Sequence, residues 1–368
     1  MPSNRQILDD LLERQEIELL RGPLFDMAPP ALPDDLDWDR VEGMMLGLAI
    51  GDALGNTTEG ELPEARQRSH GEIRDYLPNR YAGNRAVGVP SDDTQLAFWT
   101  LDQLVTDRGL VADHLAERFS EEPIFGIGSS VDTFLRSLKR GVRPWYRCAA
   151  HSAGNGALMR IAPVLIPHLR HPSLSLWADA ALAAIVTHND ATSTSACLAW
   201  VYMLWSLLAM REPPDPTWWP ATYVAVAKGL EGDACLVPRG GAYPAYRGPL
   251  WRFIGEHVGP TYHEGLSVRT AANQWYSGAF LLETVPSALY VLMRYGHDPE
   301  ACLVRAVNDT KDNDTVGAIV GSALGALYGV SGLPRRWIEN LTGRTGANDD
   351  GRILAILEQA RRAFWSAS

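Results

Sequence analysis

Glycine recurs at every fourth position in two apolar segments, residues 43–55 (GMMLGLAIGDALG) and 317–329 (GAIVGSALGALYG). A glycine inside a helix costs about 1 kcal/mol relative to alanine, so such helices are poor unless close packing returns the loss. We therefore expect two helices that pack unusually closely along their glycine faces. Membrane-spanning helices are not indicated, because the runs are short and carry Asp52 or start at Asp314.

Two similar sets of acids and hydroxyls open apolar helices that lie far apart in the chain. The sets are Ser91, Asp92 and Asp93, followed by Thr94, and Asp312, Asp314 and Thr315. Helix capping and the helix dipole would explain either set alone. If the two helix starts converge, however, four carboxylates would repel one another unless cations lay between them.

Carboxylate and hydroxyl oxygens without nearby thiols or imidazoles suit Mg²⁺ or Mn²⁺ and not zinc. Six such oxygens could be shared by two ions, with places left for water and substrate. An EF-hand calcium loop does not fit, because positions 5 and 12 counted from Asp312 are Val316 and Ala323. The sequence therefore predicts a site for two Mg²⁺ or Mn²⁺ ions.

Composition limits the possible partners. The 368 residues are 46% apolar, and the net charge of −11 argues against non-specific binding to nucleic acid. The four cysteines are far apart and form no CxxC pair, which favours a reducing compartment. The N-terminal residues are too acidic for a secretory signal, and we expect no uncharged 18-residue stretch to be a membrane span. We expect a cytoplasmic protein that binds neither nucleic acid nor membrane.

The first 36 residues form an acidic extension. Residues 1–40 carry ten acids and four arginines, a net of −6 and more than half of the total charge. Spacing of the leucines and Ile7 predicts an amphipathic helix within residues 3–20, and a proline-rich stretch follows it. The segment either folds back on its own domain or docks on a basic partner.

From residue 37 to 368 the chain alternates between apolar helical patterns and short connections, with almost no strand periodicity. The sequence therefore predicts an all-α domain, a compact orthogonal helical bundle with an N-terminal extension. Region 211–276 is rich in Pro, Gly and Trp, and we expect loops and short helices there. The helices are expected at 37–54, 92–106, 110–121, 129–140, 155–168, 174–187, 192–210, 277–295, 299–309, 315–330 and 350–365.

Five motifs occur in a characteristic order: GMMLGLAIGDALGNTTE, SDDT, GNGALMRIAP, THND, and the long stretch from SGAFLLETVP to KDNDTVGAIVGSALGALYG. In this order they resemble the ADP-ribosylglycohydrolases, relatives of dinitrogenase reductase-activating glycohydrolase. The resemblance spans about residues 40–365. It implies an all-α domain that binds two Mg²⁺ or Mn²⁺ ions and cleaves the glycosidic bond between ADP-ribose and a modified side chain.

The resemblance also implies roles for individual residues. Ser91, Asp92, Asp93, Asp312, Asp314 and Thr315 would be metal ligands. Glu59 matches a mobile glutamate over the site, and Asp93 or Glu59 would accept the proton of the attacking water. Asn155 and Gly156 match a turn against the ADP-ribose, and His188 matches a histidine near the ribose or diphosphate. Alone, each of these last three reads more simply as a turn or a helix cap.

Some positions depart from the family pattern. Thr310 and Lys311 replace the usual Gly-Gly before the second cluster, and Asn313 stands where Thr is common. Lys311 could form an outward salt bridge, neutralise a phosphate, or disturb one ion. Gly60 replaces an aromatic residue after Glu59, which makes that loop freer to move.

Three hypotheses for function follow. The first is hydrolysis of ADP-ribose from protein side chains, arginine above all. The second is an antidote or immunity protein that also blocks an ADP-ribosyltransferase toxin through residues 1–36. The third is hydrolysis of other ADP-ribosyl or glycosidic small molecules.

Overall fold

The computed structural model describes residues 2–346 and 351–365. Helices make up nearly all of the regular structure of this part, so the prediction of an all-α fold is confirmed. One two-residue antiparallel pair, β1 (Pro78–Asn79) with β2 (Arg85–Ala86), is the only sheet among the described residues. The α-helices are α1 (Asn4–Glu13), α2 (Trp38–Asn56), α3 (Pro63–His70), α4 (Asp92–Asp107), α5 (Ala112–Glu121), α6 (Ser129–Lys139), α7 (Ser175–Ile185), α8 (Ala191–Ala209), α9 (Trp218–Glu231), α10 (Leu250–Phe253), α11 (Gly259–His263), α12 (Val268–Gln274), α13 (Leu281–Tyr295), α14 (Pro299–Asp309), α15 (Asn313–Tyr328), α16 (Arg335–Glu339) and α17 (Arg352–Ala360).

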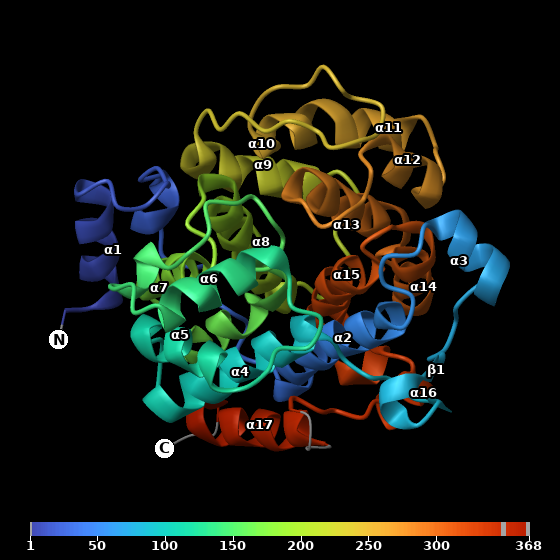
Figure 1. Cartoon of the computed structure of the whole chain (residues 1–368), viewed down its shortest axis with the longest axis horizontal. Helices are drawn as coiled ribbons and strands as arrows, with labels where there is room; N and C mark the ends of the chain where they lie inside the picture. Colours follow the sequence, from blue (N-terminus) through green and yellow to red (C-terminus); the bar gives the residue numbers. More distant parts are fainter. Residues whose placement is uncertain (1, 347–350, 366–368) are drawn as a thin grey trace.

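Helices α2 and α15 form the centre of the molecule (Figure 1) and meet along their glycines, as the sequence predicts. A Cβ atom added at Gly47 would lie 2.1 Å from the carbonyl oxygen of Gly321, and one at Gly51 would lie 1.9 Å from that of Gly317. Because the pairing runs antiparallel, the C-terminal end of α2 lies against the N-terminal end of α15. This contact brings the region of Glu59 to the second acidic cluster.

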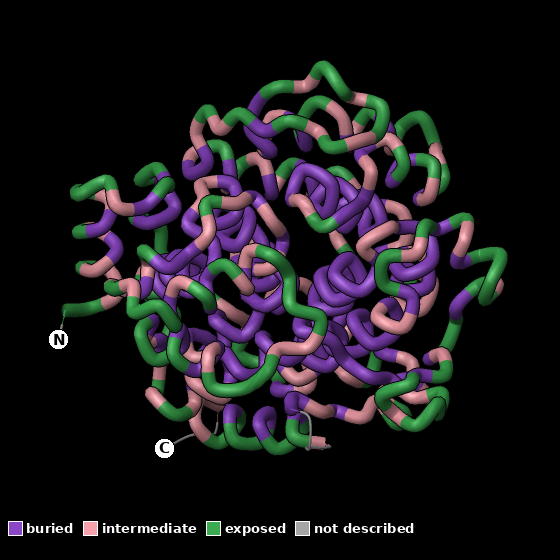
Figure 2. Tube along the Cα trace, viewed as in Figure 1, coloured by how far each residue is buried: buried purple, intermediate pink, exposed green. Residues whose placement is uncertain are grey.

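The other helices surround this pair. The central helices are buried along almost their whole length, whereas the outer loops are exposed (Figure 2). Helix α8 is long and apolar enough to span a membrane, but 83% of its apolar window is buried inside the fold. In this fold, α8 is therefore a core helix.

The N-terminal segment packs on the rest of the chain. Leu8 and Leu11 of α1 are buried in the core, and Asn4 Nδ2 donates to Asp179 Oδ1 of α7 at 2.7 Å. Farther along, the indole N–H groups of Trp177 and Trp205 donate to main-chain oxygens of the proline-rich stretch. Of the two sequence alternatives for this segment, the structure shows the one in which it folds back; a domain boundary at residue 36 remains a prediction.

Two predicted helices are wrong in part, for local reasons. Residues 155–168 form two 3₁₀ helices, η4 (Leu158–Arg160) and η5 (Ala162–His168), because Pro163 and Pro167 cannot donate to an α-helical ladder. The helix predicted from residue 277 begins only at Leu281. Tyr276 and Ser277 have φ values of 75° and 44°, outside the helical region.

Other corrections concern length. The helix predicted within residues 3–20 ends at Glu13, and Gln15 in a left-handed conformation turns the chain. Region 211–276 contains a regular helix of 14 residues, α9, besides its short helices. Helix α3 and the β1–β2 pair were not expected. The helix predicted at 350–365 is α17 with a π-helical turn, η8 (Arg361–Trp365), and its first expected position lies outside the described residues.

Candidate active site

The first acidic cluster begins α4 and is held there by Asp52 of α2. Ser91 is the N-cap residue, and its backbone N–H donates to both carboxylate oxygens of Asp52 at 3.0 and 2.9 Å. The Thr94 N–H and hydroxyl also donate to Asp52, at 3.1 and 2.5 Å. The two backbone N–H groups are among those that a helix start leaves unsatisfied. Asp52 therefore fixes where α4 begins and where Asp92 and Asp93 lie.

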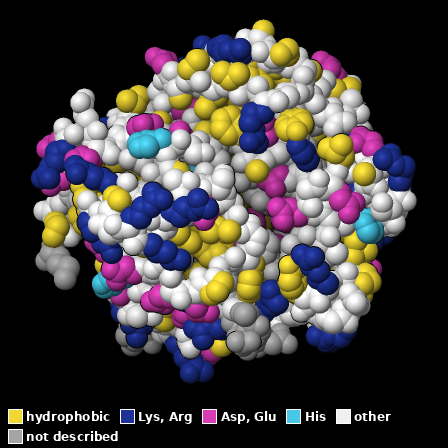
Figure 3. Space-filling model, viewed as in Figure 1, with side chains coloured by type: hydrophobic (Ala, Val, Ile, Leu, Met, Phe, Trp, Pro, Cys, Tyr) yellow, Lys and Arg dark blue, Asp and Glu magenta, His cyan; other side chains and the backbone are white. Residues whose placement is uncertain are grey.

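The two predicted clusters converge on one cavity of about 180 Å³. Figure 3 shows a hollow near the middle of one face with acidic side chains in it and basic side chains around it. Ser91 lies just outside and donates its hydroxyl to Asp93 Oδ2 at 3.1 Å. The other predicted site residues line the cavity: Glu59, Asp92, Asp93, Asn155, Gly156, His188, Asp312, Asp314 and Thr315.

The donor atoms of this cavity fit hard divalent cations. Oxygens of Asp52, Asp93 and Asp314 lie within 4.8 Å of one another, as do those of Glu59, Asp312 and Asp314. Asp93 Oδ1 is buried without a hydrogen-bond partner among the described residues. A buried acceptor left unpaired costs free energy that an ion would recover. Asp314 belongs to both groups, as a ligand shared by two ions would.

The pKa values of these carboxyl groups reflect how closely the acids are packed. Burial, and then the negative charges of Asp312 and Asp93, raise the pKa of Asp314 well above its usual range. The pKa of Asp92 is raised by burial and by Asp314, and that of Asp93 by burial and by Asp52. Without cations these carboxyl groups would hold protons that free aspartates release.

Glu59 lies at the mouth of the cavity on a turn after α2. Glu59 is exposed, whereas its neighbour Thr58 is buried. Thr58 forms a hydrogen-bonded junction with two other segments of the chain. The hydroxyl of Thr58 accepts from Arg66 Nε at 2.9 Å and from Asn313 Nδ2 at 3.0 Å. Because Asn313 stands between the two acids of the second cluster, this junction ties the Glu59 turn to that cluster.

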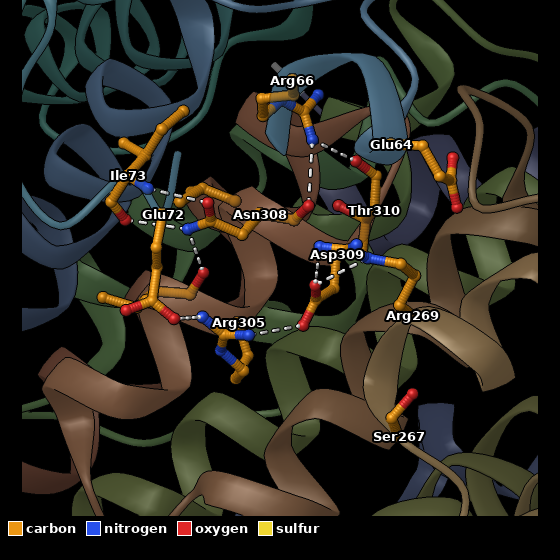
Figure 4. Close-up of polar contacts among 12 residues, drawn as sticks. Glu64, Arg66, Glu72, Ile73, Ser267, Arg269, Arg305, Asn308, Asp309 and Thr310 are labelled. Atoms are coloured by element: carbon orange, nitrogen blue, oxygen red, sulfur yellow. Dashed lines mark hydrogen bonds and ion pairs between the residues drawn. The ribbon is translucent and has the colours of Figure 1, made fainter. Parts of the chain in front are cut away.

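The chain that enters the second cluster is anchored by a polar network (Figure 4). Arg66 Nη1 donates to the Thr310 carbonyl at 2.8 Å, and Asn308 exchanges two hydrogen bonds of 2.8 Å with the backbone of Ile73. Asp309 pairs with Arg269 and Arg305. Asp312 and Asp314 thus follow a segment with few alternative positions.

The opposite wall is formed by Asn155, Gly156 and His188. Asn155 Nδ2 donates to Asp312 Oδ2 at 2.6 Å and to Thr284 Oγ1 at 3.0 Å, which links this wall to the acidic floor. A Cβ atom added at Gly156 would lie 3.1 Å from Cε1 of His188. A side chain at position 156 would therefore crowd the imidazole.

Lys311 lines an adjoining pocket of about 410 Å³ that shares Glu59 and Asp312 with the cavity. Its ammonium lies 3.7 Å from the centroid of the Tyr276 ring and contacts the Tyr276 hydroxyl. None of the three sequence hypotheses for Lys311 anticipated this cation–π contact.

Sequence reasoning missed two residues at the site. Asp52 is the acid inside a buried glycine-rich helix, and that burial in an apolar run was the available signal. Arg239 lines the cavity and pairs with the buried Glu283 through contacts of 2.8 and 2.7 Å. It lies in the region expected to be loops, and nothing in its local sequence marks it.

Comparison with known proteins identifies relatives of this chain. A family model described as ADP-ribosylglycohydrolase matches residues 32–364. The chain is 30% identical over 318 residues to ADP-ribosylarginine hydrolase Tri1 of Pseudomonas putida (strain GB-1), covering 82% of this chain and 74% of that relative. It is 27% identical to ADP-ribosyl-(dinitrogen reductase) glycohydrolase of Rhodospirillum rubrum, covering 88% of this chain and 97% of the relative.

A solved structure described as an ADP-ribosylglycohydrolase-related protein complex superposes with a TM-score of 0.64 and 26% identity, covering 89% of this chain and 98% of that one. The similarity therefore covers most of the sequence and the helical fold. The chain belongs to the ADP-ribosylglycohydrolase family, enzymes that hydrolyse glycosidic bonds.

Proposed function

We propose that this enzyme removes ADP-ribose from modified arginine side chains of proteins in the cytoplasm, with two Mg²⁺ or Mn²⁺ ions at its acidic cavity. The observation that carries the proposal is the convergence of Asp92, Asp93, Asp312 and Asp314 beside Asn155 and His188. Arginine is chosen because the relative from Pseudomonas putida is named an ADP-ribosylarginine hydrolase. ADP-ribosylated proteins are accordingly the proposed partners.

Ser91, Asp92, Asp93, Asp312, Asp314 and Thr315 would hold the ions. When bound, such ions would supply Lewis-acid polarisation of a water and of ribose hydroxyls. The protein's own contribution is to orient the distal ribose between this floor and the wall formed by Asn155 and His188. Positive charge that develops on the ribose during bond cleavage would be stabilised by the surrounding carboxylates.

We assign Glu59 as the group that accepts the proton of the attacking water. Partial removal from water, and then the charges of Asp312 and Asp52, raise the pKa of Glu59, which favours a group that both takes and returns protons. Glu59 is exposed at the cavity mouth and can pass the proton to solvent. Asp93, the other candidate, is enclosed and accepts a hydrogen bond from Ser91, which suits a ligand better.

The antidote hypothesis receives less support from the structure. Glu16 pairs with Arg147, Glu18 with His151, and Asp9 with Arg21, so much of the acidic charge of the N-terminal segment is engaged within the chain. We therefore base the proposal on hydrolysis and not on docking to an ADP-ribosyltransferase.

A substrate panel tests the proposal. Purified protein with Mg²⁺ or Mn²⁺ would be given peptides carrying ADP-ribosyl-arginine or ADP-ribosyl-serine, and small ADP-ribosyl compounds, and release of ADP-ribose would be followed by mass spectrometry. We expect release from the arginine peptide well above the other substrates. Preference for serine or for a small molecule would replace the acceptor assignment, and no release from any substrate would overturn the proposal.

A further inference from the structure

A buried arginine lies directly behind the wall of the cavity. Arg160 is 0% exposed and makes no ion pair with an acid of the described residues. Its guanidinium lies 4.9 Å from the centroid of the Phe119 ring, and burial lowers its pKa only to about 10, so it stays charged at neutral pH. Burying a charge without a counter-charge is costly. The contacts of this side chain should therefore show what it does.

Arg160 reaches the cavity through Thr187 and His188. Arg160 Nη2 donates to the Ala183 carbonyl at 3.0 Å and to Thr187 Oγ1 at 2.7 Å. The same Oγ1 lies 2.8 Å from His188 Nδ1. The three side chains thus form a continuous chain of hydrogen bonds.

The direction of these hydrogen bonds follows from the donors available. A guanidinium has no acceptor, so Thr187 Oγ1 must accept from Arg160. The single proton of the hydroxyl is then free to be donated to His188 Nδ1, which must carry no proton of its own. In the opposite arrangement the buried hydroxyl proton would find no acceptor, at a cost in free energy.

A neutral imidazole that accepts at Nδ1 carries its proton on Nε2. The Nε2 side of His188 faces the turn at Gly154 and Gly156, since a Cβ atom at Gly154 would lie 3.4 Å from Nε2. Nε2 has no hydrogen-bond partner among the described residues, and His188 lines the cavity. An N–H donor is thereby directed at the space where substrate would bind.

We propose that Arg160 and Thr187 are positioning residues that hold His188 as the Nε2–H tautomer, a neutral hydrogen-bond donor to an oxygen of bound ADP-ribose. The identity of the ligand rests on the proposed function, whereas the tautomer does not depend on it. Burial and the charge of Arg160 also lower the pKa of His188, to about 3. His188 is therefore a fixed donor and not a proton-transfer group.

Nitrogen NMR of the full-length protein labelled with ¹⁵N-histidine tests the tautomer without substrate. The nine histidines would be distinguished by comparison with His188→Gln. We expect His188 to show the Nε2–H pattern unchanged between about pH 5 and pH 8, to keep it in Thr187→Ser, and to lose it in Thr187→Val. Arg160→Met should let both tautomers coexist. An Nδ1–H pattern, or titration of His188 within that range, would overturn the proposal.

Calorimetry with free ADP-ribose tests the consequence for binding. We expect Thr187→Val to weaken binding about ten-fold, as loss of one hydrogen bond to a charged ligand would, and Thr187→Ser to change it less than about two-fold. Equal melting temperatures of the two variants would exclude a folding defect. Equal affinities of the two variants would refute the role in binding. Absence of binding by the unsubstituted protein would refute the ligand assignment, and the NMR result would still decide the tautomer.

Discussion

At the scale of single residues, Asp314 carries the most weight, because it belongs to both acid groups of the cavity. We predict that Asp314→Asn lowers turnover of an ADP-ribosylated substrate by more than about 100-fold. This loss is larger than the one expected for a residue that only supports a metal ligand through a hydrogen bond. The same change should raise the melting temperature of the metal-free protein, because it removes a buried like charge. Turnover assays and thermal denaturation in chelator measure the two effects.

Asp35→Asn provides the matched control, because Asp35 is an exposed acid whose ion pair is with Arg211 at the surface. It should leave both turnover and melting temperature nearly unchanged. Activity of Asp314→Asn close to that of the unsubstituted protein would contradict its assignment as a shared ligand.

Thr58 offers a second test at the residue scale. Thr58→Val removes the acceptor of the buried Arg66 Nε and one of the three acceptors of Asn313 Nδ2, and should lower the free energy of unfolding by about 1–3 kcal/mol. It should also lower kcat, since the Glu59 turn loses its tie to the second acidic cluster. Thr58→Ser keeps the acceptor and is expected to retain most of both. Chemical denaturation and kinetics would measure the effects, and equal behaviour of the two variants would count against the junction.

At the scale of elements, the contact between α2 and α15 determines whether the acidic clusters meet. A Cβ atom at position 321 would lie 2.0 Å from the carbonyl oxygen of Gly47. We predict that Gly321→Ala destabilises the protein by about 1–3 kcal/mol through overpacking and lowers turnover by shifting α15. Denaturation by urea and steady-state assays would measure both.

Gly255→Ala is the control for this change. Gly255 is exposed in the helical turn Ile254–Val258, and an added Cβ would make only an ordinary contact of 3.7 Å with Cγ2 of Val224. Alanine should there be neutral or stabilising by up to about 1 kcal/mol. If both alanine variants were equally stable, close glycine packing would not be what holds the two helices in register.

Helix starts that are marked by capping residues were predictable from the sequence. Ser91 and Asp312 occupy the N-cap positions of α4 and α15, near the expected residues. The errors fall where backbone geometry intervened: Pro163 and Pro167 produce 3₁₀ helices, and the left-handed Ser277 delays α13. The close packing of the glycine faces was also predictable, because few other arrangements compensate four interior glycines.

At the scale of the whole molecule, the buried acids couple stability to pH. The raised pKa values of Asp92, Asp93 and Asp314 mean that the folded state holds more protons than the unfolded chain. Their stabilising contribution is complete below about pH 4 and is lost as pH rises through the folded-state pKa values. Divalent ions should restore it by neutralising the carboxylates.

We therefore expect Mn²⁺ to raise the melting temperature more at about pH 8 than at about pH 5. Asp314→Asn should show a smaller difference between the two pH values than the unsubstituted protein. Scanning calorimetry with and without chelator would measure it. An ion-induced shift that is the same at both pH values, or unaffected by the substitution, would contradict the coupling.

The order of motifs along the chain indicated the family and ten candidate residues, which the structure brings together around one cavity. What the sequence could not indicate are long-range contacts. The hydrogen bonds from the start of α4 to Asp52, the tie from Arg66 through Thr58 to Asn313, and the chain from Arg160 to His188 join segments whose pairing appears only in the folded molecule.

The most direct test of the central claim is to titrate chelator-treated protein with Mn²⁺ while measuring release of ADP-ribose from an ADP-ribosyl-arginine peptide. If the split acidic clusters hold two ions, turnover should be absent without metal and should reach its plateau at two equivalents per chain. Full turnover in the presence of chelator, or a plateau at one equivalent, would contradict the account.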